Sequence, residues 1–141
     1  MQVRLRLRTM GDPIYEGGCL CGQVRWRASA GPANVRVCHC RLCQKATGGP
    51  FFARAVFLES VFEWSGETTR WATSPRVDRL SCARCGTPVF SEPKDAPARI
   101  GVSLATLDDR NAIRPEVHIW VSEKVDWLAL DDGLPQYREG C

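Results

Sequence analysis

Hydrophobic and polar residues alternate along much of this chain. Val24, Trp26 and Ala28 fall on one side of an extended segment, and Arg25 and Arg27 fall on the other. A period of two is typical of a strand that buries one face, and helical spacing of apolar residues is scarce. Further segments with strand character span residues 35–40, 51–57, 61–64, 69–72, 88–90, 100–104 and 117–121. The pattern predicts a mainly β protein with few or no long helices.

Tryptophans take part in this pattern. Alternation places Trp26 on the face opposite the two neighbouring arginines, so we expect it in the core. Core packing is also the favoured interpretation of Trp64, Trp71, Trp120 and Trp127, because aromatic residues in strand patterns usually pack in the interior. The alternative is that they line a substrate pocket.

The chain is predicted to be one domain, residues 1–141. Its 141 residues suit a single core. Two cysteine pairs, Cys19 with Cys21 and Cys82 with Cys85, have the close spacing of metal ligands and lie about sixty residues apart. A domain boundary between them would divide the zinc site that they are expected to form together. Residues 1–12 are the exception, because no metal site needs them; we expect a dispensable N-terminal arm or an added strand. Cys141 has no neighbouring ligand in sequence and is predicted to be a free thiol.

The formal net charge of +3 does not indicate a nucleic-acid partner. If the seven closely spaced cysteines bound two Zn²⁺ as thiolates, the net charge would change from +3 to zero, because metal ligands lose their protons. The arginines are scattered, without a run of five or six like charges. No segment approaches the roughly 20 apolar residues of a membrane span, and the first residues lack the apolar run of a signal peptide. We expect a cytoplasmic protein with no membrane partner.

Four cysteines form two close pairs with the spacing of a zinc site. Cys82 and Cys85 have knuckle spacing and precede Gly86, which can adopt a positive φ. Cys19 and Cys21 lie two apart in an extended segment, so both sulfurs face the same side. We predict that this four-cysteine cluster (Cys19, Cys21, Cys82 and Cys85) holds a structural zinc, whose binding energy stabilises the fold. The alternative is four buried reduced cysteines.

The remaining three-cysteine cluster (Cys38, Cys40 and Cys43) fits a metal site that lacks one protein ligand. Cys38 and Cys40 share a face and Cys43 returns after a short turn, whereas His39 faces the other side. Three ligands leave a position for water or substrate, as in catalytic zinc sites, and hold metal less firmly than four. The alternative is a second closed zinc with His118 as its fourth ligand. A hydrogen-bonded, partly buried histidine is the commonest explanation of His118.

The order of the cysteines and their flanking residues resembles a known family. The matching segments are Gly17-Gly18-Cys19-Leu20-Cys21-Gly22-Gln23-Val24-Arg25-Trp26, Cys38-His39-Cys40-x-x-Cys43 with Gly48, Cys82-x-x-Cys85-Gly86-Thr87-Pro88, Leu107-Asp108-Asp109 and Pro115-Glu116-Val117-His118-Ile119-Trp120. Over residues 15–137 this arrangement is similar to the glutathione-dependent formaldehyde-activating enzymes, a family that includes centromere protein V.

This resemblance implies a β-tent fold of small antiparallel sheets joined by a structural zinc. It implies that the four-cysteine cluster holds that zinc and that the three-cysteine cluster holds a catalytic zinc, giving two sites per chain. The named activity of the family is the reversible addition of glutathione to formaldehyde, which forms S-hydroxymethylglutathione. Glutathione sulfur would occupy the open position of the catalytic zinc, and the aldehyde would be attacked beside it.

Three cations near the three-cysteine cluster are predicted to bind substrate. Glutathione carries two carboxylates, and Arg41, Lys45 and Arg54 are suitable partners for them. Gln44 stands where family members often carry an arginine. Another thiol or another small electrophile is therefore the alternative substrate.

Two function classes follow. The first is a zinc-dependent carbon–sulfur lyase of the S-hydroxymethylglutathione synthase type, acting on a thiol–aldehyde adduct of a small thiol such as glutathione and a small aldehyde. The second is a non-enzymatic, zinc-stabilised binding or scaffold module. Such a module would need an interaction tail or a basic face, and this chain offers neither beyond Arg4, Arg6 and Arg8. The sequence leaves the oligomeric state open.

Overall fold

The computed structural model describes residues 14–95 and 98–140. The predicted arm, residues 1–12, and the predicted free thiol of Cys141 lie outside these ranges. Among the described residues, none of the helices combines the length and the apolar character needed to span a lipid bilayer.

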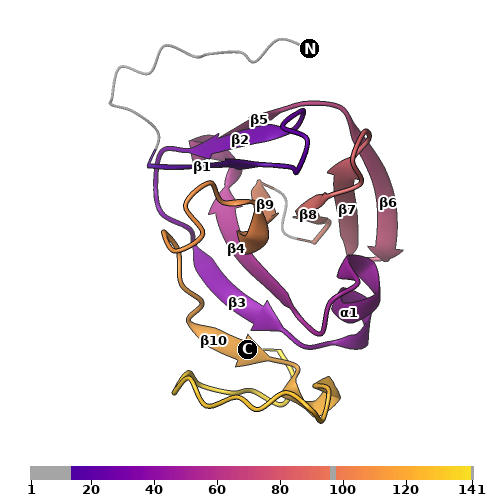
Figure 1. Ribbon diagram of the computed structural model, residues 1–141, viewed down its shortest axis with the longest axis vertical. Coiled ribbons are helices and arrows are strands. Elements are labelled where there is room, and N and C mark those ends of the chain that lie inside the picture. Colours follow the sequence, from indigo (N-terminus) through magenta and orange to yellow (C-terminus); the bar gives the residue numbers. More distant parts are fainter. Residues whose placement is uncertain (1–13, 96–97, 141) are drawn as a thin grey trace.

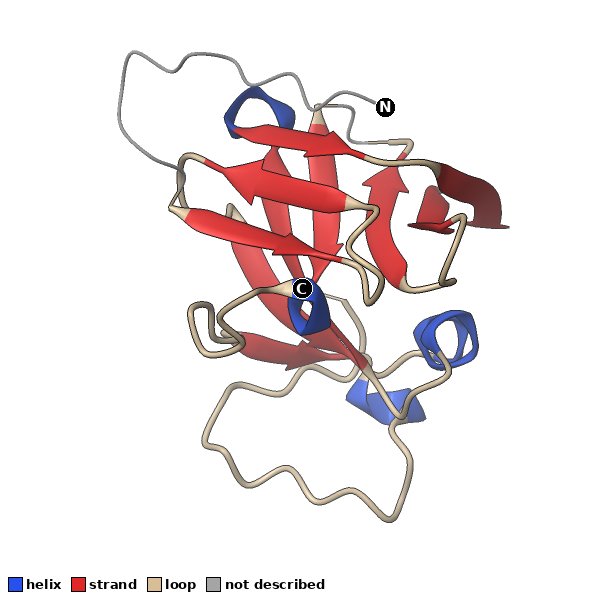
Figure 2. Cartoon of the chain, turned by 45° about the horizontal axis from the view of Figure 1, so that its top comes forward, coloured by secondary structure: helices blue, strands red, loops and turns tan. Residues whose placement is uncertain are grey.

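Strands dominate the described part of the chain (Figure 1). Three of them form a sheet of order β1-β2-β5, with bounds Tyr15–Gly18 (β1), Arg25–Ala28 (β2) and Phe62–Ser65 (β5). Seven form a second sheet of order β10-β3-β4-β9-β8-β7-β6, with bounds Asn34–Cys38 (β3), Phe52–Leu58 (β4), Thr68–Ser74 (β6), Val77–Cys82 (β7), Pro88–Pro93 (β8), Arg99–Ser103 (β9) and Val117–Ile119 (β10). The prediction of a mainly β fold is confirmed, as the strand-rich cartoon of Figure 2 also shows.

Strand pairing is antiparallel in both sheets except at one edge. There, β10 runs parallel to β3, with Ile119 opposite Cys38. In Figure 1, β10 and the segment that follows it lie along the outer side of β3. This edge brings residues 117–120 next to the three-cysteine cluster.

The hydrophobic core lies between the two sheets. Trp26 of β2 and Phe62 of β5 stack with ring centroids 5.5 Å apart, and Phe62 meets Phe57 of β4 at 5.4 Å and Phe90 of β8 at 5.9 Å. Trp26 is only 2% exposed, as its alternation with arginines predicts. Aromatic contacts of this kind add to the stabilisation from buried area, so they fix the small sheet on the large one.

Short helices interrupt the strands. They are the α-helix α1 (Arg41–Thr47) and the 3₁₀ turns η1 (Glu59–Val61), η2 (Leu104–Thr106) and η3 (Val121–Glu123). The sequence predicts only a short turn where α1 lies, because a helix of two turns is too brief to show a 3.6-residue period. Its ends are stabilised locally: the Cys40 sulfur accepts a hydrogen bond from the Cys43 N–H at 3.4 Å, and Gly48 closes the helix with φ 73°.

Two strands, β1 and β7, have no counterpart among the predicted segments. β1 contains the pair Gly17-Gly18, and glycine weakens strand propensity. β7 carries Arg79 and Leu80 side by side and buries both, so its pattern of charged and apolar residues does not alternate. Each strand is imposed by its neighbours rather than by its own sequence.

The tryptophan expectations need correction. Trp71 and Trp127 are 42% and 74% exposed, so core packing is wrong for both. Trp64 lies on the edge strand β5 and is 37% exposed. Its ring covers Phe90, with ring centroids 4.8 Å apart. Trp120 lines a cavity beside the three-cysteine cluster, which is the role given above as the alternative.

Gly17 provides a test of the packing between the sheets. A Cβ at this position would meet the Thr106 carbonyl oxygen and stand 2.6 Å from the Trp26 ring. Gly17→Ala is therefore expected to lower the free energy of unfolding by about 2 kcal/mol through overpacking. Gly31→Ala is the matched control, because its Cβ would meet nothing within 4 Å. Chemical denaturation of the two variants should separate them, and equal stabilities would contradict this packing.

Candidate metal centres

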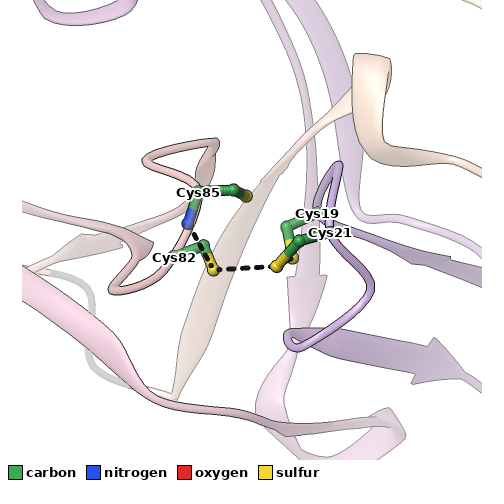
Figure 3. Close-up of side chains that lie close together, drawn as sticks. All are labelled: Cys19, Cys21, Cys82 and Cys85. Carbon is green, nitrogen blue, oxygen red and sulfur yellow. Dashed lines mark hydrogen bonds between the residues drawn. The ribbon is translucent and has the colours of Figure 1, made fainter.

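The four-cysteine cluster joins two distant loops. Cys19 and Cys21 follow β1, whereas Cys82 ends β7 and Cys85 lies in the turn before β8. Figure 3 shows the two pairs facing each other from opposite loops. The Cys19 and Cys21 sulfurs are 3.6 Å apart, the Cys21 and Cys82 sulfurs are 3.8 Å apart, and all four lie within 4.8 Å of one another. A tetrahedral zinc with bonds of about 2.3 Å separates its sulfurs by about 3.8 Å, so this donor set fits zinc.

Hydrogen-bond donors surround these sulfurs. The Val24 N–H donates to the Cys19 sulfur at 3.2 Å, and the Cys85 N–H donates to the Cys82 sulfur at 3.4 Å. The Thr87 hydroxyl lies 3.0 Å from the Cys85 sulfur, and this hydrogen bond is the main cause that lowers the pKa of Cys85 to about 5. Donors of this kind stabilise thiolates, which is the form that a metal ligand takes.

Two glycines allow the cysteine loops to turn. Gly22 follows the first pair with φ 82°, and Gly86 follows the second with φ 78°. The left-handed region costs glycine little, so each loop can return at once and present both of its sulfurs. The positive φ predicted for Gly86 is confirmed.

The three-cysteine cluster lies within one continuous segment. Cys38 ends β3, Cys40 is the N-cap of α1, and Cys43 lies in the first turn of that helix. Their sulfurs lie within 4.8 Å of one another. Hydrogen bonding from the Cys38 thiol lowers the pKa of Cys40, and the same contact raises the pKa of Cys38. The contact thus favours a thiolate at Cys40 and a thiol at Cys38. A divalent cation bound by the cluster would replace the remaining thiol protons.

No histidine belongs to this donor group among the described residues. The His118 Nδ1 atom lies 2.9 Å from His39 Nε2, and its Nε2 atom lies 2.7 Å from Asp132 Oδ2. Both ring nitrogens of His118 are thus occupied. The geometry does not support His118 as a fourth ligand, and it agrees with the hydrogen-bonded, buried histidine of the sequence prediction.

The contacts of these two rings define their tautomers. The Asp132 carboxylate can only accept, so His118 carries its proton on Nε2 when neutral and accepts from His39 at Nδ1. His39 must then hold its proton on Nε2, which leaves Nδ1 as a lone pair. That atom is buried without a hydrogen-bond partner in the described structure, and burial is the main cause that lowers the pKa of His39 to about 4.

Gln44 supports the same region from α1. It is buried, and its amide donates to the His39 carbonyl at 2.7 Å and to the Glu123 carbonyl at 3.0 Å. Its side-chain oxygen accepts from Arg41 at 2.6 Å. Gln44, the residue that differs from the common family pattern, therefore ties α1 to the backbone of His39, which follows β3, and to η3.

The predicted substrate-binding cations occupy different places. Arg41 and Lys45 are exposed on α1, and the Arg41 guanidinium contacts Gln44. Arg54 instead lines a cavity of about 200 Å³ together with Cys38 and Cys43. The structure thus brings one of the three to the open side of the cluster.

Arg79 is a residue that sequence reasoning missed. It is 8% exposed, donates to the Cys43 sulfur at 3.2 Å and to the Thr73 hydroxyl at 3.1 Å, and lies 5.0 Å over the Phe52 ring. It comes from β7, whose sequence does not alternate and predicts no strand. The sequence therefore gave no signal that it would meet a cysteine 36 residues away.

These features define a mainly β protein with two cysteine clusters suited to metal. The family model for the glutathione-dependent formaldehyde-activating enzymes matches residues 14–123, and the chain belongs to this family. The resemblance predicted from the cysteine motifs is confirmed.

Individual relatives agree with this assignment. An uncharacterized lyase from Schizosaccharomyces pombe is 28% identical over 78 residues, which cover 55% of this chain and 57% of that protein. A Halomonas elongata protein, assigned by name to the glutathione-dependent formaldehyde-activating enzymes, is 27% identical over 129 residues, covering 84% and 82%. The crystal structure of a Rhodobacter sphaeroides structural genomics target shares the fold, with a TM-score of 0.56, 20% identity and coverage of 86% and 98%. The two relatives thus agree with the family assignment, and the solved structure agrees with the mainly β fold.

Removing one ligand from each cluster should have different effects on stability. Cys21→Ala and Cys40→Ala are each expected to lose about one zinc per chain in elemental analysis. Cys21→Ala should also lower the free energy of unfolding by about 3 kcal/mol or more, because its cluster ties two distant loops. Cys40→Ala should cost only about 1 kcal/mol, as expected for loss of a helix cap. Equal losses in denaturation would contradict the structural and open assignments.

The two histidines allow a direct test of the tautomers, because the chain has only two. His39 is expected to stay neutral on lowering the pH from 7 to 5, since a depressed pKa near 4 delays protonation in the folded state. Folding thus favours neutral His39, a contribution present above about pH 6.5 and lost as pH falls through about 4. Long-range ¹H–¹⁵N NMR should show its proton on Nε2, with His39→Asn identifying its signals. Titration of His39 near 6.5 would contradict the buried arrangement.

Proposed function

We propose that this protein is a zinc-dependent carbon–sulfur lyase of the S-hydroxymethylglutathione synthase type, with one structural and one catalytic zinc per chain. The observation that carries the proposal is the three-cysteine cluster, whose donor group contains no fourth protein ligand among the described residues and which opens onto a cavity. Three-ligand zinc sites are typical of catalysis. The cytoplasm is the proposed compartment, because reduced thiols persist there.

The donor set fits the chemistry required. A zinc held by Cys38, Cys40 and Cys43 would supply an open coordination position that favours the thiolate form of a substrate thiol at neutral pH. The cluster's own residues hold this position steady: Cys40 is fixed as the cap of α1, and the Cys43 sulfur receives the Arg79 hydrogen bond.

Substrate would approach across neighbouring hollows. A hollow of about 620 Å³ is lined by Thr47 at the end of α1 and by Gly49 just after the helix, and it shares Phe52 with the small cavity. It is large enough for the body of a tripeptide thiol. Arg41 and Lys45 on α1 are proposed to attract glutathione carboxylates from the exposed side, and Arg54 is proposed to act inside the cavity.

The reaction can be measured at equilibrium. NMR exchange spectroscopy of glutathione, formaldehyde and their adduct should show faster interconversion with zinc-loaded protein than without it. Cys40→Ala is expected to lower the protein-dependent rate at least about a hundredfold, because the variant would lose the zinc that is proposed to bind the substrate sulfur. Arg70→Met is the control, since Arg70 pairs with Asp78 and Glu92 on exposed strands. No acceleration by a two-zinc protein would instead favour the non-enzymatic binding or scaffold module.

A further inference from the structure

The small cavity lies on one face of the seven-stranded sheet. Alternation along β4 places Phe52, Arg54 and Val56 on this face, and the facing wall includes Arg79 of β7. Cys38 and Cys43 reach it from the cluster, and Trp120 lines it from the segment after β10. The cavity is therefore a compartment next to the reacting position, separate from the hydrophobic core on the other face.

The volume of this cavity limits what enters it. About 200 Å³ is roughly the space of six water molecules in the liquid. A tripeptide must lie mainly outside, whereas formaldehyde would leave most of the space empty. The cavity suits an electrophile of a few carbon atoms.

Positive charge gathers around this space without a carboxylate to balance it. Arg54 stands opposite Arg36 in the pairing of β3 and β4, and neither guanidinium has a hydrogen bond or salt bridge with another described residue. Arg79 donates hydrogen bonds to the Cys43 sulfur and the Thr73 hydroxyl. The described residues that line the cavity include no Asp or Glu.

The charge balance leaves room for one anion. Three thiolates and one Zn²⁺ carry one negative charge, and a substrate thiolate adds a second. The three arginines carry three positive charges, so one remains. The acids of the nearby strands do not supply the missing charge, because Asp78 and Glu92 point to the other side and pair with Arg70 and Lys94.

We propose that the cavity binds a small aldehyde that bears a carboxylate, an oxo acid of the glyoxylate class, with Arg54 as the partner of that carboxylate. The inference rests on the proposed function, because it names the electrophile of the same reaction. The thiol sulfur forms a bond to the aldehyde carbon, the carbonyl electron pair moves to oxygen, and the thiol proton ends on that oxygen. The step needs no oxidant or reductant. A guanidinium can hold a carboxylate by two parallel hydrogen bonds, which favours Arg54 in this role.

The test compares charged and neutral probes on zinc-loaded protein. Exchange rates of glutathione with glyoxylate should exceed those with glycolaldehyde, a neutral aldehyde of equal chain length, by at least about tenfold after subtraction of the uncatalysed rates. Arg54→Met should abolish this preference and Arg54→Lys should restore part of it. Arg70→Met should retain it, because Arg70 lies on the other face.

A binding measurement separates the cavity from the reaction. Oxamate, an unreactive carboxylate of similar shape, should bind the parent in calorimetry and quench tryptophan fluorescence through Trp120. Arg54→Met should weaken this binding at least about tenfold at unchanged zinc content and unchanged denaturation midpoint. Equal oxamate binding by parent and variant, or none by either, would overturn the proposal.

Two further outcomes identify which idea fails. Catalysed exchange with formaldehyde, but no carboxylate preference and no oxamate binding, would leave the lyase function standing and remove the oxo acid. Oxamate binding that depends on Arg54, without catalysed exchange of any aldehyde, would retain the carboxylate site and reject the lyase.

A last comparison uses two thiols, mercaptoacetate and 2-mercaptoethanol, each tested with formaldehyde. A preference for mercaptoacetate that requires Arg54 would assign the carboxylate to the thiol and overturn the aldehyde assignment.

Discussion

The structure depends on gathering sulfur atoms that repel one another once they ionise. Seven thiols converge in two groups, and thiolates at such separations need a cation between them. The four-cysteine cluster applies this constraint between the loop after β1 and the end of β7, which belong to different sheets. A metal there would act together with the aromatic core around Trp26 and Phe62. Metal binding and sheet packing would then be parts of a single folding event.

The three-cysteine cluster gathers its sulfurs within one continuous segment, and one of its sides borders a cavity. Cys40 caps α1 and also belongs to the group of three sulfurs, so the start of the helix determines the geometry of the cluster. Behind it, His39 is anchored through His118 and Gln44. The side away from the cavity is thus filled by the hydrogen-bonded pair of His39 and His118, in which only the Nδ1 atom of His39 lacks a partner among the described residues. The proposed substrate position requires an open side toward the cavity, whereas a structural zinc site is closed by four protein ligands.

Sequence predicted the parts that depend on local spacing. The cysteine clusters follow from intervals of two and three residues, and the paired burial of Val24, Trp26 and Ala28 follows from alternation. It failed where tertiary contacts decide. β1 is a strand because Gly17 lets Trp26 approach, and β7 buries an arginine that no isolated pattern would place inside. The exposed Trp71 and Trp127 show the reverse case, since an apolar side chain has no preferred face until its neighbours are known.

The division between motif and scaffold would allow relatives with the same cysteine motifs to differ in the electrophile that they accept. The cysteine segments determine where a metal and a sulfur can meet, and they are short and contiguous. The cations around the cavity come from β3, β4 and β7, whose register, rather than the motif, brings them beside the cluster. Substitutions of these cations can change the charge and volume of the cavity without replacing any of the cysteines. Differences in electrophile among relatives are therefore expected to follow residues such as Arg54 and Arg79 rather than the cysteine motifs that identify the family.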